Sequence, residues 1–427
     1  MSEKKETVIR IHGAGLQIGR EAITVSSEGT TILLDYGVLM TDRKPEFPEK
    51  VVPGTINAVF LSHAHLDHSG GLPLLYLRGG PPVYTTTLTA RISELLIEDM
   101  LNISRYYIPY EELELKEMLD KVNPVTFNQK VHVRDLELET LNAGHIPGSL
   151  MAKVRTKAGN VLFTGDFNTT DTRLLEGARP DVSDVDALIM ESTYASTDHP
   201  ERNALEREFV AKVKEVVEGG GTALVPAFAV GRSQEIISVL RAQNYEGPIY
   251  LDGMAREATK IMAGFPKYIK NYDEFRKVAK SVKIVKGIRE REKVLKNPGV
   301  VVSPAGMLRG GAVMYYLENI VKDHKNGIFL VSFQIPGTPG RVLLDTGKIP
   351  LNGKLVDVGD MTHFFDFSAH SGRKELIDFV KMLNGGAKVI LIHGEPSTTL
   401  AFRDTLLDMG IDAVAANNGD SFVLSRR

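Results

Sequence analysis

The sequence contains no cysteine among its 427 residues. A disulfide framework, a thiol nucleophile and a cysteine-type zinc site are therefore excluded, and any metal ion must be held by histidine and carboxylate side chains. Long hydrophobic runs are also absent, since no apolar stretch approaches the roughly 20 residues that a membrane-spanning helix needs. The N-terminal residues 1–6 are polar and charged. We therefore expect a soluble, unexported, cytoplasmic protein without a membrane partner.

An excess of positive charge is missing as well. The chain has 51 Lys and Arg against 54 Asp and Glu, a formal net charge of -3. This balance argues against a generally basic protein that coats DNA, because phosphate binding needs concentrated Lys and Arg. Nucleic acid would have to bind in a local groove. The length suffices for two compact domains, because single hydrophobic cores stop growing at about 250 to 300 residues.

Short apolar runs that end in a chemically capable polar residue recur along the chain. Each run reads as a buried strand, and helical patterns such as 87–101 and 205–217 separate them, which predicts an α/β architecture. Strand ends that gather at one edge of such a sheet are where sites are usually built. We therefore expect the polar residues that follow the runs to share one cleft: Asp35, Ser62 with His63, Asp166, Glu191 and His393.

The middle of the chain has a strand and helix alternation of its own, at 222–226, 231–241, 248–251, 300–303 and 328–332. The pattern of polar strand ends resumes after it, at His370 and His393. We interpret the middle stretch as a domain inserted into another domain. The predicted boundaries are 1–195 for the first part of the outer domain, 196–348 for the insert and 349–427 for the second part.

The strongest local signal is Ser-His-Ala-His-Leu-Asp-His at 62–68. Alternate residues of an extended segment point the same way, so His63 and His65 can grip one ion, while Asp67 and His68 are turned toward a second ion where strand becomes helix. Imidazole and carboxylate donors suit a catalytic zinc site with an open position. Further ligands are needed, and His145, Asp166 and His393 can supply them; a hydrogen-bonded histidine is an equal reading for His145 or His393 taken alone.

The order His-x-His-x-Asp-His, then His, Asp and His, resembles the metallo-β-lactamase signature over nearly the whole chain. The resemblance implies an αββα sandwich that binds two Zn²⁺. It places His63, His65 and His145 on one zinc, and Asp67, His68 and His393 on the other, with Asp166 bridging. Asp35 matches an acidic residue that supports the ligands from behind. The fold also hosts thioesterases, lactamases and flavoproteins, so it does not choose a substrate.

Three further matches resemble the β-CASP subgroup, which processes nucleic acids. Glu191 matches its motif A, His370 its motif B and His393 its motif C, and the insert corresponds to the α/β β-CASP domain. The resemblance places Asp67, Glu191 and His370 in the catalytic group. His370 is the candidate acid for the leaving oxygen, and Glu191 can hold its other ring nitrogen. The alternatives are a core histidine and a plain surface carboxylate.

RNA contacts are predicted at two kinds of position. Residues 256–293 contain twelve Lys and Arg against five Asp and Glu, enough to neutralise several phosphates if they do not simply form a solvated helix face. The aromatic residues among them suit core packing better than base stacking. Phosphate contacts are predicted for Ser303 and Gly306 in a Gly-rich stretch, where turn chemistry is an equal reading, and for Ser371 and Gly372 after the candidate acid.

Within the subgroup, the motifs are most similar to the archaeal-type homologue of the nuclease subunit of the cleavage and polyadenylation specificity factor, and also resemble ribonuclease J. We therefore expect a zinc-dependent ribonuclease that hydrolyses phosphodiester bonds of single-stranded RNA in processing or decay. Endonuclease and 5′-to-3′ exonuclease action both stay open, as does a homodimer, which rests on resemblance alone. Two other classes are considered: a small-molecule ester or thioester hydrolase, and an inactive scaffold, which would have lost zinc ligands.

Overall fold

The computed structural model describes residues 5–41 and 44–426. The chain divides into two compact units. The first unit runs to Asp171 and also contains Glu176–Asp198 and the chain from His370 onward. The second unit consists of Thr172–Leu175 and His199–Ala369. In the described part of the chain, no helix has the length and apolar character required to cross a membrane.

The first unit is built on two seven-stranded sheets in the described residues. One sheet has the order β24 (Ser421–Arg426), β1 (Lys5–Gly13), β2 (Ala22–Ser27), β3 (Thr30–Leu34), β6 (Ala58–Phe60), β7 (Val83–Thr85) and β8 (Val122–Pro124). The other has the order β23 (Ala413–Ala415), β22 (Lys388–Ile392), β13 (Ala187–Glu191), β12 (Asn160–Phe163), β11 (Leu150–Arg155), β10 (Leu136–Asn142) and β9 (Gln129–Val133). Each sheet is antiparallel in one part and parallel in the other, and its parallel strands carry their C-terminal ends to one edge.

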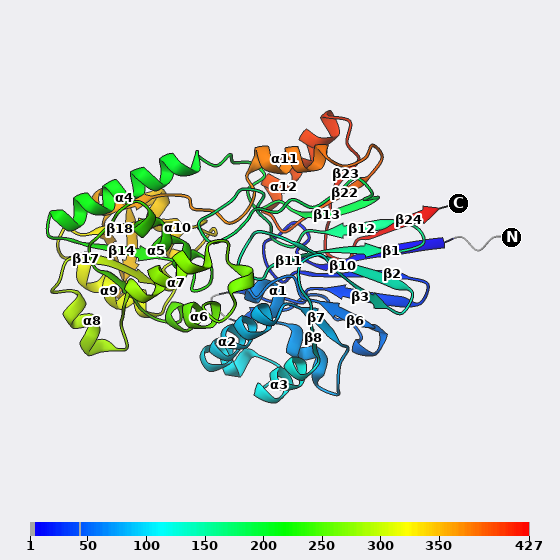
Figure 1. The fold of residues 1–427 in the computed structure, drawn as a ribbon, viewed down its shortest axis with the longest axis horizontal. Helices are drawn as coiled ribbons and strands as arrows, with labels where there is room; N and C mark the ends of the chain where they lie inside the picture. Colours follow the sequence, from blue (N-terminus) through cyan, green and yellow to red (C-terminus); the bar gives the residue numbers. More distant parts are fainter. Residues whose placement is uncertain (1–4, 42–43, 427) are drawn as a thin grey trace. The chain divides into compact units, whose positions relative to one another are not determined.

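Strand alternation explains how these sheets form four layers. In β3, Ile32 and Leu34 enter the core between the sheets, whereas Leu33 packs on the opposite face. In β13, Ile189 faces the inner core and Met190 the outer one. The outer faces are covered by α2 (Thr87–Ser104) and α3 (Glu112–Asp120) on one sheet and by α11 (Arg373–Lys381) and α12 (Pro396–Asp408) on the other (Figure 1).

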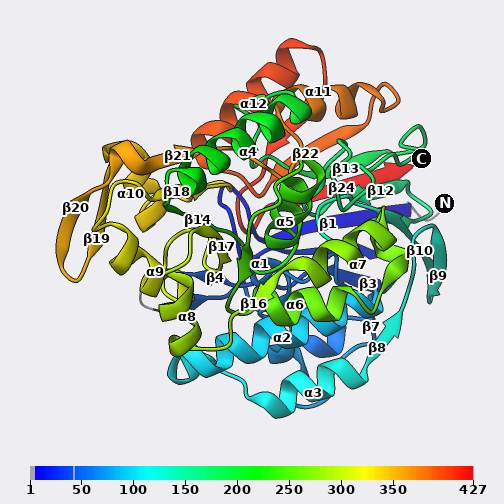
Figure 2. The same ribbon diagram turned by 60° about the vertical axis from the view of Figure 1, so that its left-hand side comes forward.

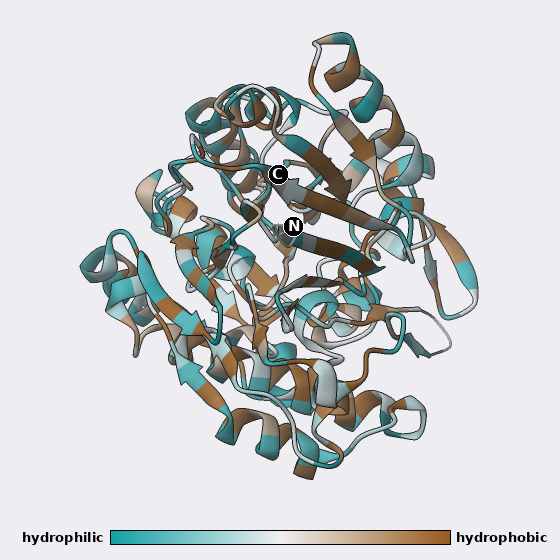
Figure 3. Ribbon diagram, turned by 90° about the vertical axis from the view of Figure 1, so that its right-hand side faces the viewer, coloured by the Kyte–Doolittle hydropathy of each residue, from teal (hydrophilic) through white to brown (hydrophobic). Residues whose placement is uncertain are grey.

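The predicted αββα sandwich is therefore confirmed for the first unit. Figure 3, coloured by hydropathy, shows brown apolar segments along its strands, with the strands near the two termini side by side. The rings of Phe60 and Phe163 meet edge to face across the inner core, with centroids 6.5 Å apart. The short helix α1 (Leu66–Ser69) and the hairpin of β4 (Leu39–Met40) and β5 (Pro45–Glu46) complete the unit.

The second unit has one parallel six-stranded sheet in its described residues. The order is β16 (Lys283–Ile284), β15 (Ile249–Leu251), β17 (Gly299–Ser303), β14 (Thr222–Pro226), β18 (Gly327–Leu330) and β21 (Thr362–Phe364). Helices α4 (Arg202–Glu218), α5 (Arg232–Ala242), α6 (Ala255–Met262) and α7 (Tyr272–Ser281) contribute to the core on one face. Helices α8 (Ile288–Val294), α9 (Ala312–Ile320) and α10 (Pro339–Thr346) contribute to the core on the other. The insert is thus the expected α/β domain.

The second unit ends later than the insert predicted at 196–348. Strand β21 pairs with β18 inside its sheet, and the hairpin of β19 (Lys348–Leu351) and β20 (Lys354–Asp357) packs through Ile349 and Leu351 into its core (Figure 2). The chain therefore belongs to this unit as far as Ala369. The segment Thr172–Leu175 joins it because the Glu235 carboxylate accepts hydrogen bonds from two of its backbone N–H groups, each at 3.0 Å.

Candidate metal centre

Most of the predicted site residues of the first unit lie at or shortly after strand ends. His63 and His65 follow β6, and the next turn, α1, carries Asp67 and His68. The other candidates come from the ends of the second sheet: His145 after β10, Asp166 after β12, Glu191 as the last residue of β13 and His393 after β22. Two candidates at strand ends adopt left-handed backbone, Asp35 at φ 57° and His393 at φ 46°. Non-glycine residues in this conformation are concentrated at functional sites.

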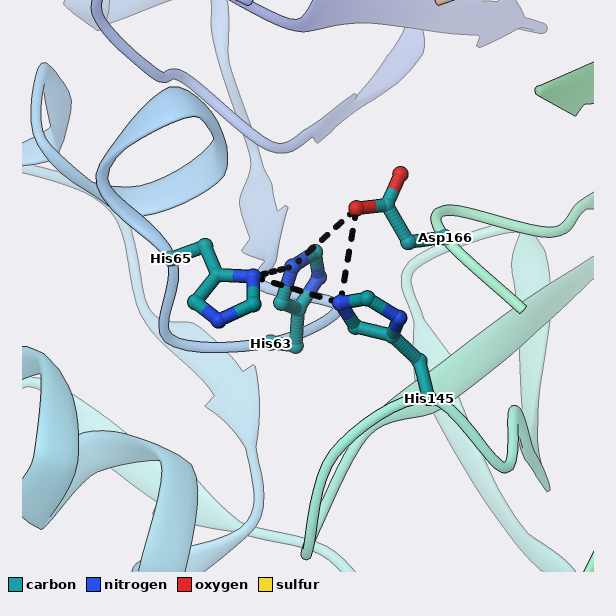
Figure 4. Close-up of side chains that lie close together, drawn as sticks. All are labelled: His63, His65, His145 and Asp166. Atoms are coloured by element: carbon teal, nitrogen blue, oxygen red, sulfur yellow. Dashed lines mark hydrogen bonds and ion pairs between the residues drawn. The ribbon is translucent and has the colours of Figure 1, made fainter. Parts of the chain in front are cut away.

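A first cluster, the three-histidine cluster, joins His63, His65 and His145 with Asp166 (Figure 4). His65 Nδ1 lies 3.1 Å from His63 Nε2 and 3.2 Å from His145 Nε2. Asp166 Oδ2 lies 3.5 Å from the Nε2 atoms of both His63 and His145. Four donor atoms from three separate loops therefore face one point.

A second cluster, the Glu21 cluster, joins Glu21, His68, Asp166 and His393, all of them buried. Asp166 Oδ1 lies 3.4 Å from His68 Nε2 and 3.5 Å from His393 Nδ1. Glu21 Oε2 lies 3.9 Å from the Nε2 atoms of both histidines. Asp166 thus presents one oxygen to each cluster, which is the geometry that a bridging ligand requires.

The sequence assigns Asp67 to the second ion and does not single out Glu21. The structure places Asp67 Oδ2 3.5 Å from His393 Nε2, but the compact group of ligand atoms around His68 contains Glu21. Glu21 stands before a strand, not after one, so the strand-end pattern could not find it. Arg20, which adopts a left-handed φ of 46°, turns the chain ahead of Glu21, and no local sequence pattern marks this turn as part of a site.

Asp35, predicted to support the ligands, forms hydrogen bonds with Ser62 and with the candidate ligand His68. Its Oδ1 accepts a hydrogen bond from the Ser62 N–H at 2.7 Å, and its Oδ2 accepts one from the Ser62 hydroxyl at 2.6 Å. The same Oδ2 lies 2.7 Å from His68 Nδ1. A carboxylate at Nδ1 fixes the imidazole tautomer, so His68 turns the lone pair of Nε2 toward the Glu21 cluster.

His370 and Glu191 form the pair expected from the sequence. His370 Nδ1 lies 2.8 Å and 2.9 Å from the two Glu191 oxygens, and His370 Nε2 lies 3.9 Å from Asp166 Oδ2. Glu191 is itself held, because its Oε1 accepts a hydrogen bond from the Phe167 N–H at 3.0 Å. The His370 ring also packs against the His145 ring at 4.6 Å. Nε2 of His370 is therefore directed toward the clusters.

The two clusters differ electrostatically. Burial lowers the pKa of His63 and lowers that of His65 to about 4, so both imidazoles are neutral near pH 7. Burial acts in the same direction on His393, but the charge of Asp166 and the contact with Asp67 outweigh it and raise the pKa to about 10. Burial raises the pKa of Glu21 to about 8. A cation that binds the Glu21 cluster must displace these protons.

The donor sets fit divalent metal ions. Ligand atoms bonded to one tetrahedral ion at about 2.1 Å lie about 3.4 Å apart, close to the separations from Asp166. Among the described residues, His68 Nε2, His393 Nε2 and Asp166 Oδ1 are buried and make no hydrogen bond. Buried polar atoms are normally satisfied, and a shared cation would satisfy all three. Cysteine-free sets of imidazole and carboxylate are of the kind found in catalytic sites.

The predicted phosphate contacts receive less support. The Ser371 hydroxyl accepts a hydrogen bond from the Thr169 N–H at 3.1 Å, and the Ser371 N–H donates to Phe167 O at 2.8 Å. Gly372 caps α11, whose next two N–H groups already donate to Thr197 O and Asp198 Oδ1. Ser303 and Gly306 lie in the second unit, at and just after the end of β17. Phosphate binding by these four residues stays a prediction.

The basic stretch 256–293 serves the second unit partly as structure. Tyr268 and Phe275 are buried, as core packing predicts. Arg256 donates to the carbonyl oxygens of Gly253 and Val285, and Arg291 forms an ion pair with Asp252 at 2.7 Å.

Comparisons with known proteins identify the domains of the chain. A model of the Beta-Casp domain matches residues 233–343, and a model of the metallo-beta-lactamase superfamily domain matches residues 24–192. A model of the Zn-dependent metallo-hydrolase RNA specificity domain matches residues 356–416. A solved structure of a protein of unknown function from Enterococcus faecalis aligns with a TM-score of 0.61 at 17% identity, covering 98% of this chain and 100% of that one, which shows the fold alone.

Relatives in archaea match along nearly the whole chain. The RNase aCSPSF2 of Saccharolobus solfataricus is 40% identical over 420 residues, which cover 97% of this chain and 85% of that protein. The transcription termination factor FttA of Pyrococcus horikoshii is 33% identical over 471 residues, which cover 99% of this chain and 72% of that protein. The resemblance seen in the sequence motifs is confirmed: the chain belongs to the β-CASP family of the metallo-β-lactamase superfamily.

Proposed function

We propose that this chain is a zinc-dependent ribonuclease that hydrolyses phosphodiester bonds of single-stranded RNA, as an endonuclease, a 5′-to-3′ exonuclease or both. Its family and its RNase-named relatives indicate a metal-dependent ribonuclease that processes RNA. The observation that supports two ions in the site is the pair of clusters that share Asp166, with one oxygen toward each.

The candidate ligands form two groups, one for each ion. His63, His65 and His145 would hold one Zn²⁺, His68, His393 and Asp67 would hold the other, and Asp166 would contact both. When bound, two neighbouring Zn²⁺ supply Lewis acidity, which lowers the pKa of water and neutralises charge on phosphate oxygens. Asp35 keeps the His68 ring in one tautomer and orientation, so the site is preorganised before substrate arrives.

His370 acts on the leaving oxygen. Attack of water on phosphorus breaks the bond to a ribose oxygen, which leaves more easily if it receives a proton as the bond breaks. The charge of Glu191 and Asp166 outweighs burial and raises the pKa of His370, which favours the protonated imidazole that this role requires. Glu191 holds Nδ1. The proton on Nε2 is therefore the one available to the leaving oxygen.

The experiment that tests the proposal is digestion of one RNA labelled in turn at its 5′ and 3′ ends, supplied with a 5′-monophosphate or a 5′-triphosphate. Internal products from both labels indicate an endonuclease, and mononucleotides released from a 5′-monophosphate end indicate an exonuclease. A phenyl ester and a thioester, tested in parallel, address the small-molecule hydrolase.

The matched variant is the double substitution Asp67→Ala with His68→Ala. It should abolish cleavage of the labelled RNA, because it removes two predicted ligands of one ion. RNA cleavage at the wild-type rate in this variant would reject the site. Turnover of the esters without RNA cleavage would reject the substrate class.

A further inference from the structure

Glu21 is a buried carboxylate next to the candidate metal ligands. Its side chain is 1% exposed, although it immediately precedes β2. Its backbone makes two hydrogen bonds. The Glu21 N–H donates to Asp67 O at 2.8 Å, and Glu21 O accepts from the Gly37 N–H at 2.9 Å. Backbone hydrogen bonds therefore join Glu21 to the loop after β3 and to the helix α1, which carries Asp67 and His68.

Both carboxylate oxygens of Glu21 lack a hydrogen-bond partner among the described residues. The nearest nitrogens are His68 Nε2 and His393 Nε2, each 3.9 Å from Oε2 and each also without a hydrogen bond in that part of the chain. A direct charge-assisted hydrogen bond would bring such atoms to about 2.7 to 2.9 Å. The pair of contacts at 3.9 Å leaves room for an ion between the atoms instead.

The spacing supports one shared ion. Ligands at about 2.1 Å from a metal lie about 3.0 to 3.4 Å apart when adjacent and up to about 4.2 Å apart when opposite, depending on coordination number. The 3.4 Å between Asp166 Oδ1 and His68 Nε2, and the 3.9 Å from Glu21 Oε2 to the Nε2 atoms of His68 and His393, fall in this range.

We propose that Glu21 is a further ligand of the ion held by His68 and His393. With this carboxylate, the site should accept a hard cation such as Mn²⁺ more readily than the three-histidine site does. The three-histidine cluster offers three imidazoles and one carboxylate, whereas the Glu21 cluster offers two imidazoles and two carboxylates, with Asp67 beside them. Imidazole suits zinc and carboxylate oxygen suits manganese. The inference rests on the proposed two-metal function and adds a ligand and a metal preference to it.

The test measures metal binding by the full chain, independently of activity. Chelator-stripped protein is dialysed against Zn²⁺ alone, Mn²⁺ alone, or both, and bound metal is counted by mass spectrometry, with bound Mn²⁺ also followed by loss of the free-ion electron spin resonance signal. Wild type should bind two ions per chain. The preference for Zn²⁺ over Mn²⁺ should be smaller at the Glu21 cluster than at the three-histidine cluster. Glu21→Gln should keep the tight zinc and weaken binding of the second ion by at least about 10-fold, because loss of a partner behind a ligand already costs about 10- to 100-fold. The loss should be larger for Mn²⁺ than for Zn²⁺.

Two further variants keep the outcome decisive. Glu49→Gln removes a half-exposed carboxylate of the same unit and should leave both affinities unchanged. Glu21→Ser, with circular dichroism melts of the stripped proteins, checks that the loss does not come from unfolding. Equal affinity and equal selectivity for the second ion in wild type and both Glu21 variants would overturn the inference while leaving the proposed function intact. A wild-type chain that binds fewer than two ions would overturn both.

Discussion

Asp35 is the residue on which the orientation of His68 depends. Its two oxygens accept three hydrogen bonds, from the Ser62 N–H, the Ser62 hydroxyl and His68 Nδ1. Asp35→Asn keeps the shape but leaves a single acceptor oxygen, so one or more of these bonds is lost. We expect zinc affinity to fall about 10- to 100-fold, the usual effect of removing a partner behind a metal ligand.

The measurement for this change is competition with a chromophoric chelator. Asp135→Asn, which alters an exposed carboxylate of the same unit, provides the control and should behave as wild type. An Asp35→Asn protein with unchanged zinc affinity would show that Asp35 only stabilises the fold.

His370 is the proposed acid for the leaving oxygen. His370→Ala should slow single-turnover cleavage of single-stranded RNA by about 10²- to 10⁴-fold, the usual contribution of a general acid, and should keep its metal content. An aryl phosphodiester has a leaving group that needs no proton, so its hydrolysis should suffer much less. The exposed His324 gives the control variant, His324→Ala. Equal losses on both substrates, or loss of metal, would contradict the acid role.

Some site residues could be predicted because they belong to a pattern of neighbouring residues in the sequence. His63, His65 and His145 meet in the structure because each follows an apolar run or shares an extended segment with its partner. Glu21 was not predictable in this way, since its position depends on a backbone contact with Asp67 O, 46 residues further on. Its burial is a tertiary property that no local spacing reveals.

Among the elements, the loop after β3 and the helix α1 are docked by backbone contact. Tyr36 N donates to His68 O and Val38 N donates to Leu66 O, both at 2.9 Å. A Cβ at Gly37 would lie only 1.6 Å from Asp67 O, so no side chain fits there without moving α1. Gly37→Ala should therefore destabilise the fold by at least about 1 to 3 kcal/mol, the usual cost of overpacking, and lower the metal content.

Thermal and chemical unfolding measured together with metal analysis check this prediction. Gly54→Ala is a suitable comparison, because a Cβ at Gly54 meets nothing within 4 Å. If both variants were as stable as wild type and bound equal metal, the close packing of the loop on α1 would be unimportant.

Element types were predictable because hydrophobic patterns are local. The strand expected at 222–226 is Thr222–Pro226, and the helix expected at 87–101 is Thr87–Ser104. The end of the insert was not predictable from pattern, because β21 is only three residues long and owes its place to pairing with β18. Partner strands separated by more than 30 residues leave no periodic signal in either segment.

At the scale of the molecule, the metal ions should stabilise the loops of the first unit selectively. At a free ion concentration about 100 times Kd, binding stabilises the bound state by about 2.7 kcal/mol, which slows opening-limited exchange about 100-fold. We expect chelation to accelerate amide hydrogen exchange at residues 61–69, 143–149 and 391–395. The strands β14 and β17 of the second unit serve as the internal control. Uniform acceleration throughout the chain would indicate general unfolding instead.

The proposed site holds two ions, one on each side of Asp166. Anomalous diffraction at the zinc edge from crystals of the zinc-loaded chain tests it most directly. We expect two peaks, one among His63, His65 and His145 and one among His68, His393, Asp67 and Glu21, both in contact with Asp166. A single peak, or peaks away from Asp166, would contradict it.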